Sequence, residues 1–201
     1  MQELERLKAQ VLERTERAVR RFVHAADAYS LRYDFAAALA EYEKAARWAK
    51  RDVSPALWAD VQNLLGIAHG QLGIRVDGES SRVHLAQAVV AYRSALEVYT
   101  KKDLPQHWAM TQNNLGDALR DQAQRLPPDS PERTELLTQA VGVFRAALEI
   151  YTQTMFPMDW ARAQWNLARA CALLSDDRCA ADSFANVLHV YPDWSEGYSE
   201  A

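Results

Sequence analysis

The residues best suited to chemistry in this 201-residue chain are five histidines and two cysteines. Cys171 and Cys179 lie outside the C-x-x-C and H-x-x-x-H spacings of zinc ligands and redox pairs, so we interpret both as small, buried hydrophobic residues. The histidines lack an accompanying pattern of nucleophile, base and orienting acid; they are His24, His69, His84, His107 and His189. We therefore predict no catalytic residue, no metal site and no cofactor, and a protein that is not an enzyme.

Phosphate binding is not supported either. The glycines between Gly66 and Gly78 are spaced somewhat like those of a phosphate-binding loop. They lack the G-K-[ST] ending, and they lie within and after an expected helix instead of between a strand and a helix. His69 falls in the same stretch, at a helix position that Leu119 and Cys171 hold in the sister segments. We expect it to have a packing role.

A block of sequence that occurs three times determines the expected architecture. Its copies surround Trp58, Trp108 and Trp160, at spacings of 50 and 52 residues that are typical of helical arrays. Each copy has a proline three residues before the tryptophan, where a missing N–H and a fixed φ suit the first turn of a helix. The tryptophan shares one helix face with a glutamine four residues later and a leucine seven residues later. We therefore expect these tryptophans to be packing residues.

A second block precedes each tryptophan and carries an alanine, aromatic, alanine pattern on one helix face. Its aromatic residues are Tyr42, Tyr92 and Phe144. In the tryptophan block, the leucine is followed by Gly66 in one copy and Gly116 in the next. Because glycine inside a helix costs roughly 1 kcal/mol relative to alanine, we expect these two glycines to mark places where a partner helix comes close.

The pairing of the two blocks resembles the tetratricopeptide repeat, a 34-residue helix-turn-helix unit. The resemblance implies an all-α fold, an α-solenoid of antiparallel helix pairs in a right-handed superhelix. We expect about nine helices and no sheet. The four expected repeats are residues 19–52, 59–101, 109–153 and 161–194. Residues 1–18 are then a charged, helical N-terminal extension, and residues 195–201 are a C-terminal stub.

The second and third expected repeats are longer than the family pattern. Each has about a dozen extra residues between its two helices, rich in turn formers, with the sequences GIRVDGESSRV and RLPPDSPERTE. In the latter, Ser130 followed by Pro131 is typical of an N-cap with proline at the first helical position. We therefore expect regular helices joined by elaborated loops.

The resemblance also implies where a partner binds. In this family the first helix of each repeat lines the concave side, and ligands are held by the stripe beside the core face. Carried over to this chain, the candidate binding residues are Asn63, Ile67, Asn113, Asn114, Asp117, Arg120, Arg162, Trp165, Asn166 and Arg169. Asparagine amides can hold an extended peptide backbone, and Trp165 between two arginines is typical of a binding hot spot. The alternative is that the asparagines simply bond neighbouring helices.

Charge and hydropathy limit the partners and the location. The net charge of −4 argues against a nucleic-acid surface, and no apolar run approaches the roughly 18 residues that a membrane-spanning helix needs. The highly charged N-terminus has no secretory signal. We therefore expect a cytoplasmic protein with protein or peptide partners.

Three functional hypotheses follow. The first is a non-enzymatic scaffold that binds a peptide or partner segment in the concave groove, and we favour it. The second is an assembly element that forms homo-oligomers through the N-terminal helix or an uncapped C-terminal end; a regulatory domain of a larger signalling protein is a related alternative. The third is a cavity that holds an active site or senses a small ligand.

Overall fold

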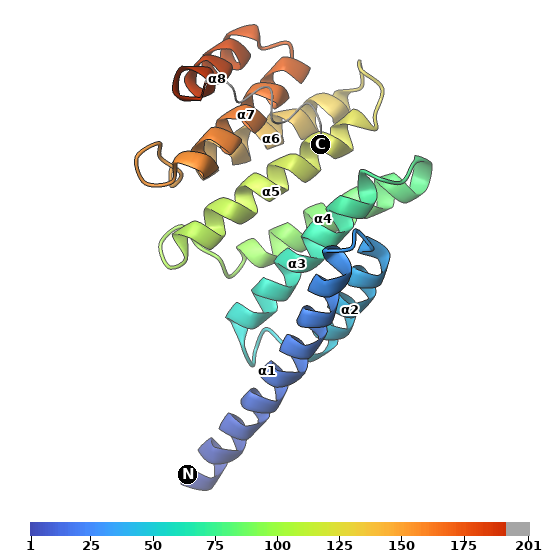
Figure 1. Ribbon diagram of the computed structural model, residues 1–201, viewed down its shortest axis with the longest axis vertical. Coiled ribbons are helices and arrows are strands. Elements are labelled where there is room, and N and C mark those ends of the chain that lie inside the picture. Colours follow the sequence, from blue (N-terminus) through green and yellow to red (C-terminus); the bar gives the residue numbers. More distant parts are fainter. Residues whose placement is uncertain (192–201) are drawn as a thin grey trace. The chain divides into compact units, whose positions relative to one another are not determined.

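The computed structural model describes residues 1–191, which contain eight α-helices and no strand (Figure 1). They divide into two compact units, one ending at Thr100 and one beginning at Lys101. The first unit holds α1 (Gln2–Ser30), α2 (Phe35–Trp48), α3 (Pro55–Gly73) and α4 (Gly78–Leu96). The second holds α5 (Pro105–Gln124), α6 (Pro131–Leu148), α7 (Pro157–Leu173) and α8 (Asp177–Val190).

The expected all-α fold, an α-solenoid of helix pairs, is confirmed. Within each unit every helix packs against the next one along the chain. The described residues form eight helices instead of about nine, and one helix, α1, spans both the expected N-terminal extension and the first helix of the first repeat. It is continuous because residues 2–30 contain neither glycine nor proline. The end of the fourth expected repeat, 192–194, and the stub 195–201 lie outside the described residues.

Proline and short polar side chains set the helix starts. The helices α3, α5 and α7 begin at Pro55, Pro105 and Pro157, as the repeated proline predicts. The predicted cap at Ser130 is confirmed, since its hydroxyl accepts from the backbone N–H of Arg133 at 3.1 Å. In the same way, the N-cap carboxylates of Asp34 and Asp176 accept from backbone N–H groups in the first turns of α2 and α8.

The expectation of elaborated loops in the second and third repeats is wrong. The connections are short, residues 74–77 and 125–130, and most of the extra residues lengthen helices instead. Gly78, with φ of +63°, starts α4, where a left-handed conformation suits glycine. The buried Ser81 hydroxyl then donates to the carbonyl of Gly73 at 2.6 Å, which ties the start of α4 to the end of α3.

The helix pairs close on the glycines that the sequence singled out. A methyl group added at Gly116 would lie 2.5 Å from the ring of Phe144, and one at Gly66 would lie 2.6 Å from the ring of Tyr92. Both rings are buried and come from the second helix of the same pair. Each glycine is therefore required by the close approach of an aromatic ring, as predicted.

The three repeated tryptophans are half-buried and pack against the core. Trp58 contacts the cluster that contains Val61, and both Trp108 and Trp160 contact the cluster that contains Tyr151. All three tryptophans therefore act as packing residues, as predicted. No helix in the described part of the chain combines the length and the apolarity needed to cross a membrane.

The interpretation of the two cysteines as small, buried hydrophobic residues holds for Cys171, which is buried, but it missed their pairing. Cys171 in α7 and Cys179 in α8 are joined by a disulfide, with their Cα atoms 5.8 Å apart. The tight turn between the two helices, in which Ser175 has a positive φ of 59°, brings them together. A sequence spacing of eight thus becomes a spatial contact at a helix-turn-helix corner.

Candidate functional site

The candidate site lies in the second unit, on the face where α5 and α7 pack together. Eight of the ten predicted binding residues, Asn114 among them, are in these two helices. The other two, Asn63 and Ile67, belong to α3 in the first unit. There Asn63 is buried and Ile67 is exposed, and the structure does not bring them together with the rest.

A buried polar network joins α5 to α7. Arg120, which is 5 % exposed, donates to Asp117 at 2.6 Å and to Asp121 at 2.9 Å. From α7, the side-chain amide of Asn166 donates to the second carboxylate oxygen of Asp117 at 3.2 Å and to the side-chain oxygen Oδ1 of Asn113 at 3.4 Å. Asn113 and Asn166 thus bond to each other across neighbouring helices, which is the arrangement that the alternative role of the asparagines describes.

The electrostatics of this network are those of a buried, paired cluster. Burial raises the pKa of Asp117, and the positive charge of Arg120 opposes that rise. Burial disfavours the charge of Arg120, but Asp117 and Asp121 outweigh it and raise the arginine's pKa. At the exposed edge of the cluster, burial and the nearby Arg120 lower the pKa of Arg169. Breaking such a buried pair typically costs about 3–5 kcal/mol, so the network fixes how α5 and α7 pack.

The remaining predicted residues have separate surroundings. Trp165 packs edge to face on Phe184 of α8, with ring centroids 5.0 Å apart, which is a packing contact. Asn114 is half-buried on α5. Arg162 donates to Asp159 at 2.7 Å, one turn earlier on α7. Arg162 is one of the ten predicted binding residues, and it lines a cavity.

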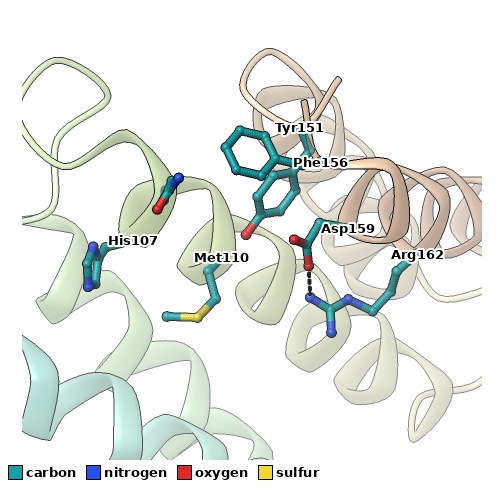
Figure 2. Close-up of a pocket in the computed structure, with 7 residues that line it drawn as sticks. His107, Met110, Tyr151, Phe156, Asp159 and Arg162 are labelled. Carbon is teal, nitrogen blue, oxygen red and sulfur yellow. Dashed lines mark hydrogen bonds and ion pairs between the residues drawn. The ribbon is translucent and has the colours of Figure 1, made fainter. Parts of the chain in front are cut away.

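That cavity, of about 270 Å³, lies at the N-terminal ends of α5 and α7 (Figure 2). We call it the Tyr151 pocket; its lining residues are Gln106, His107, Met110, Tyr151, Phe156, Asp159 and Arg162. Pro105 and Pro157 start the two helices, and Phe156 stacks edge to face on Tyr151, with centroids 5.8 Å apart. The helix starts therefore place several hydrogen-bonding groups beside an aromatic wall.

The hydroxyl of Tyr151 is the most informative group in the pocket. The residue is 4 % exposed, and Figure 2 shows its oxygen directed toward Met110 and Asp159. Within residues 1–191 this hydroxyl forms no hydrogen bond. Burial, and secondarily the charge of Asp159, raises the pKa of Tyr151 to about 12, so the hydroxyl is a hydrogen-bond donor at neutral pH.

The sister tyrosine in the first unit has a partner. Tyr99 occupies the same place in its repeat, and its hydroxyl donates to Asp60, two residues after Trp58. The corresponding position, two residues after Trp108, is Met110. The loss of this acceptor leaves the Tyr151 hydroxyl facing the pocket.

A second, larger and more apolar cavity adjoins the first and shares Gln106, His107 and Phe156 with it. Its volume is about 540 Å³. We call it the Met155 pocket; its apolar lining residues are Leu104, Pro105, Ile150, Met155 and Phe156. The exposed Met155 lies in the turn between α6 and α7. The two pockets place an apolar and a polar cavity side by side.

The sequence prediction missed most of this double pocket. The predicted binding residues included Arg162, but Tyr151, Met155 and Phe156 follow the end of α6 and were not on a predicted binding helix. The sequence did contain a signal for this pocket. Tyr99 and Tyr151 recur at equivalent places, but the position two residues after the tryptophan is Asp60 in one repeat and Met110 in the next.

Two other clusters contain possible metal ligands. Cys171, Asp176 and Cys179 place their ligand atoms within 4.8 Å of one another, but the two sulfurs are already bonded to each other. In the first unit, the Nδ1 atoms of His69 and His84 lie 3.0 Å apart between α3 and α4. Burial, and secondarily the charge of His84, lowers the pKa of His69 to about 4. This contact agrees with the predicted packing role of His69.

The fold and this face define an all-helical α-solenoid protein with a double pocket between neighbouring helix pairs of its second unit. No protein-family model matches the chain, and no curated protein sequence is significantly similar to it.

Proposed function

We propose that this chain is a non-enzymatic, tetratricopeptide-like scaffold that binds an extended segment of a partner protein along the α5 and α7 face. The observation that carries the proposal is the double pocket, in which the Tyr151 and Met155 pockets share a wall. An extended segment presents successive side chains along its length, and pockets for such side chains give peptide recognition its specificity. The polar Tyr151 pocket and the apolar Met155 pocket could therefore each hold one side chain of the segment.

The stripe beyond the pocket supports the same proposal. Met110, Asn113 and Asp117 follow one another along one face of α5 at helical spacing. The Arg120 network holds α5 against α7 through buried, directional hydrogen bonds. A rigid, preorganised face loses little entropy when a segment binds it, so the network is a support for the site instead of the contact itself.

A peptide selection tests the proposal. Peptides from a random-sequence display library would be selected on the full chain, and their Kd values measured for the wild type, Arg162→Glu and Arg178→Glu. Arg162 lines the Tyr151 pocket, whereas Arg178 is exposed on α8 and serves as the matched control. We expect Arg162→Glu to weaken binding about tenfold or more and the control to change it less than about twofold. Peptides that bind both variants as they bind the wild type, or a failure to enrich any peptide, would refute the proposal.

Self-association is the second candidate function. Leu4, Leu7 and Val11 share one face of α1 and are 56 %, 49 % and 56 % exposed, and Figure 1 shows this end of α1 extending past α2. An apolar stripe of this kind can form a helix-helix interface. Light scattering over a range of concentrations tests it, with Leu7→Glu as the variant. A monomer mass at every concentration would remove this candidate.

A cytoplasmic location is part of the main proposal. Cytosolic thiols are kept reduced, so in that compartment the Cys171–Cys179 disulfide of the structure would be reduced to two free thiols. Thiol labelling of the protein in its native cell, compared before and after reduction, tests this directly.

A further inference from the structure

The Tyr151 pocket offers a donor and an acceptor next to each other. The Tyr151 hydroxyl is the donor, and the neighbouring Asp159 carboxylate is the acceptor. One carboxylate oxygen of Asp159 already accepts from Arg162, which leaves the other oxygen for a ligand. A bound group that both accepts and donates a hydrogen bond would satisfy both at once.

The charges around these groups decide between ligand classes. A ligand carboxylate would be attracted by Arg162 but repelled by Asp159, and for a ligand ammonium or guanidinium the attraction and the repulsion are exchanged. The Asp159–Arg162 pair makes this part of the lining neutral overall. A neutral carboxamide has the required acceptor and donors, and its carbon neighbours can pack on the ring of Phe156.

We propose that the Tyr151 pocket is a carboxamide-binding subsite, in which the amide oxygen accepts from the Tyr151 hydroxyl and an amide N–H donates to Asp159. This inference rests on the proposed binding of a partner segment, whose amide it would recognise. The amide comes either from an asparagine or glutamine side chain or from the main chain of the segment. The volume of about 270 Å³ suits a single side chain and falls just below the roughly 300–1,000 Å³ of drug-sized ligand sites.

The repeats themselves provide the comparison that favours a ligand. In the first unit, Asp60 accepts the hydrogen bond of Tyr99 from within the chain. In the second unit, Met110 replaces that acceptor and the hydroxyl faces the cavity. A ligand amide would therefore take the place that the aspartate holds in the sister repeat.

Titration of the full chain with capped amino acids, followed by ¹H–¹⁵N NMR, tests the proposal. The probes are N-acetylglutamine amide, the matched N-acetylglutamate amide, N-acetyl-lysine amide and N-acetyl-leucine amide, which carries main-chain amides alone. We expect shifts for residues 106–110 and 156–162, with the glutamine probe binding about fivefold or more tightly than the glutamate and lysine probes. For so small a ligand the Kd should be on the order of 1 mM.

Tyr151→Phe is the decisive variant, with Tyr99→Phe as its matched control. Removing the Tyr151 hydroxyl should weaken glutamine binding by about two- to tenfold, whereas Tyr99→Phe should leave it unchanged. Equal affinity of all four probes, lost in Tyr151→Phe, would support a main-chain amide as the ligand, since all four carry the same main-chain amides.

Three results would overturn the subsite: a tighter glutamate or lysine probe, no shifts at these residues at saturating probe, or an unchanged affinity in Tyr151→Phe. A failure here is distinguishable from a failure of the proposed function. The probes test the pocket without a partner, whereas the selected peptides test partner binding whatever group enters the pocket.

Discussion

The amide of Asn166 on α7 donates to the carboxylate of Asp117 on α5 at 3.2 Å, and this carboxylate also holds Arg120. The bond joins two residues that are 49 positions apart in the chain and belong to neighbouring repeats. It shows that part of the expected binding stripe is used to fix the spacing of helices. Arg162, on the same stripe, lines the Tyr151 pocket instead.

Asn166→Ala should destabilise the protein. The substitution removes a donor from a buried carboxylate and leaves Asp117 less satisfied, which typically costs about 1–3 kcal/mol. The free energy of unfolding from urea denaturation measures the effect. Asn186→Ala on the exposed side of α8 is the matched control, and we expect it to stay within about 0.5 kcal/mol of the wild type. Equal stabilities of the two variants would show that the network contributes nothing.

Two glycine-to-alanine substitutions should change the stability of the protein in opposite directions. Gly116→Ala would place a methyl group 2.5 Å from the buried Phe144 ring and should destabilise by about 1–3 kcal/mol. Gly142→Ala lies in α6 with nothing within 4 Å and should stabilise by up to about 1 kcal/mol, through helix propensity. Thermal unfolding of both variants checks the pair. A stabilising Gly116→Ala would contradict the close packing of α5 on α6.

The burial of His69, and secondarily the neighbouring His84, should make stability depend on pH. The pKa of His69 in the folded protein is about 4, below its usual value of about 6.5. Between these values the unfolded chain binds the proton and the folded protein does not, so stability should be highest above pH 6.5, fall as the pH drops, and level off near pH 4. Because His69 is only partly buried, we expect a loss on the order of 1 kcal/mol.

His69→Gln checks that dependence, since it removes the titrating group. The difference in unfolding free energy between the variant and the wild type should change between pH 6.5 and 4. His189→Gln, at an exposed position on α8, should show a constant difference. A constant difference for His69→Gln as well would mean that folding does not lower the pKa of His69.

The fold was largely predictable because its signals are local and repeated. Proline at helix starts and Ser130 at a cap act within one turn, and Gly116 is marked by its cost in a helix. The inserted segments were misjudged because Gly78 starts a helix instead of ending one, and because the residues that follow Gly78 and Pro131 are helical instead of belonging to loops. The disulfide was missed because its contact depends on the α7 to α8 turn.

The site was less predictable, and Tyr151 shows why. In sequence, Tyr151 and Tyr99 are equivalent residues at the end of equivalent blocks. Whether each hydroxyl is satisfied depends on the residue that faces it from a helix about 40 positions earlier, which is Asp60 in one case and Met110 in the other. The spacing of residues along one helix face predicts neither the residue that faces each tyrosine hydroxyl nor the cavity beside it.

The central claim is that a partner segment binds at the double pocket, and NMR mapping of a selected peptide on the ¹⁵N-labelled full chain tests it most directly. We expect saturable chemical-shift changes within residues 103–110 and 149–162, the two stretches that contain the lining of the Tyr151 and Met155 pockets. Shifts confined to α1–α4 or to α8 would contradict it.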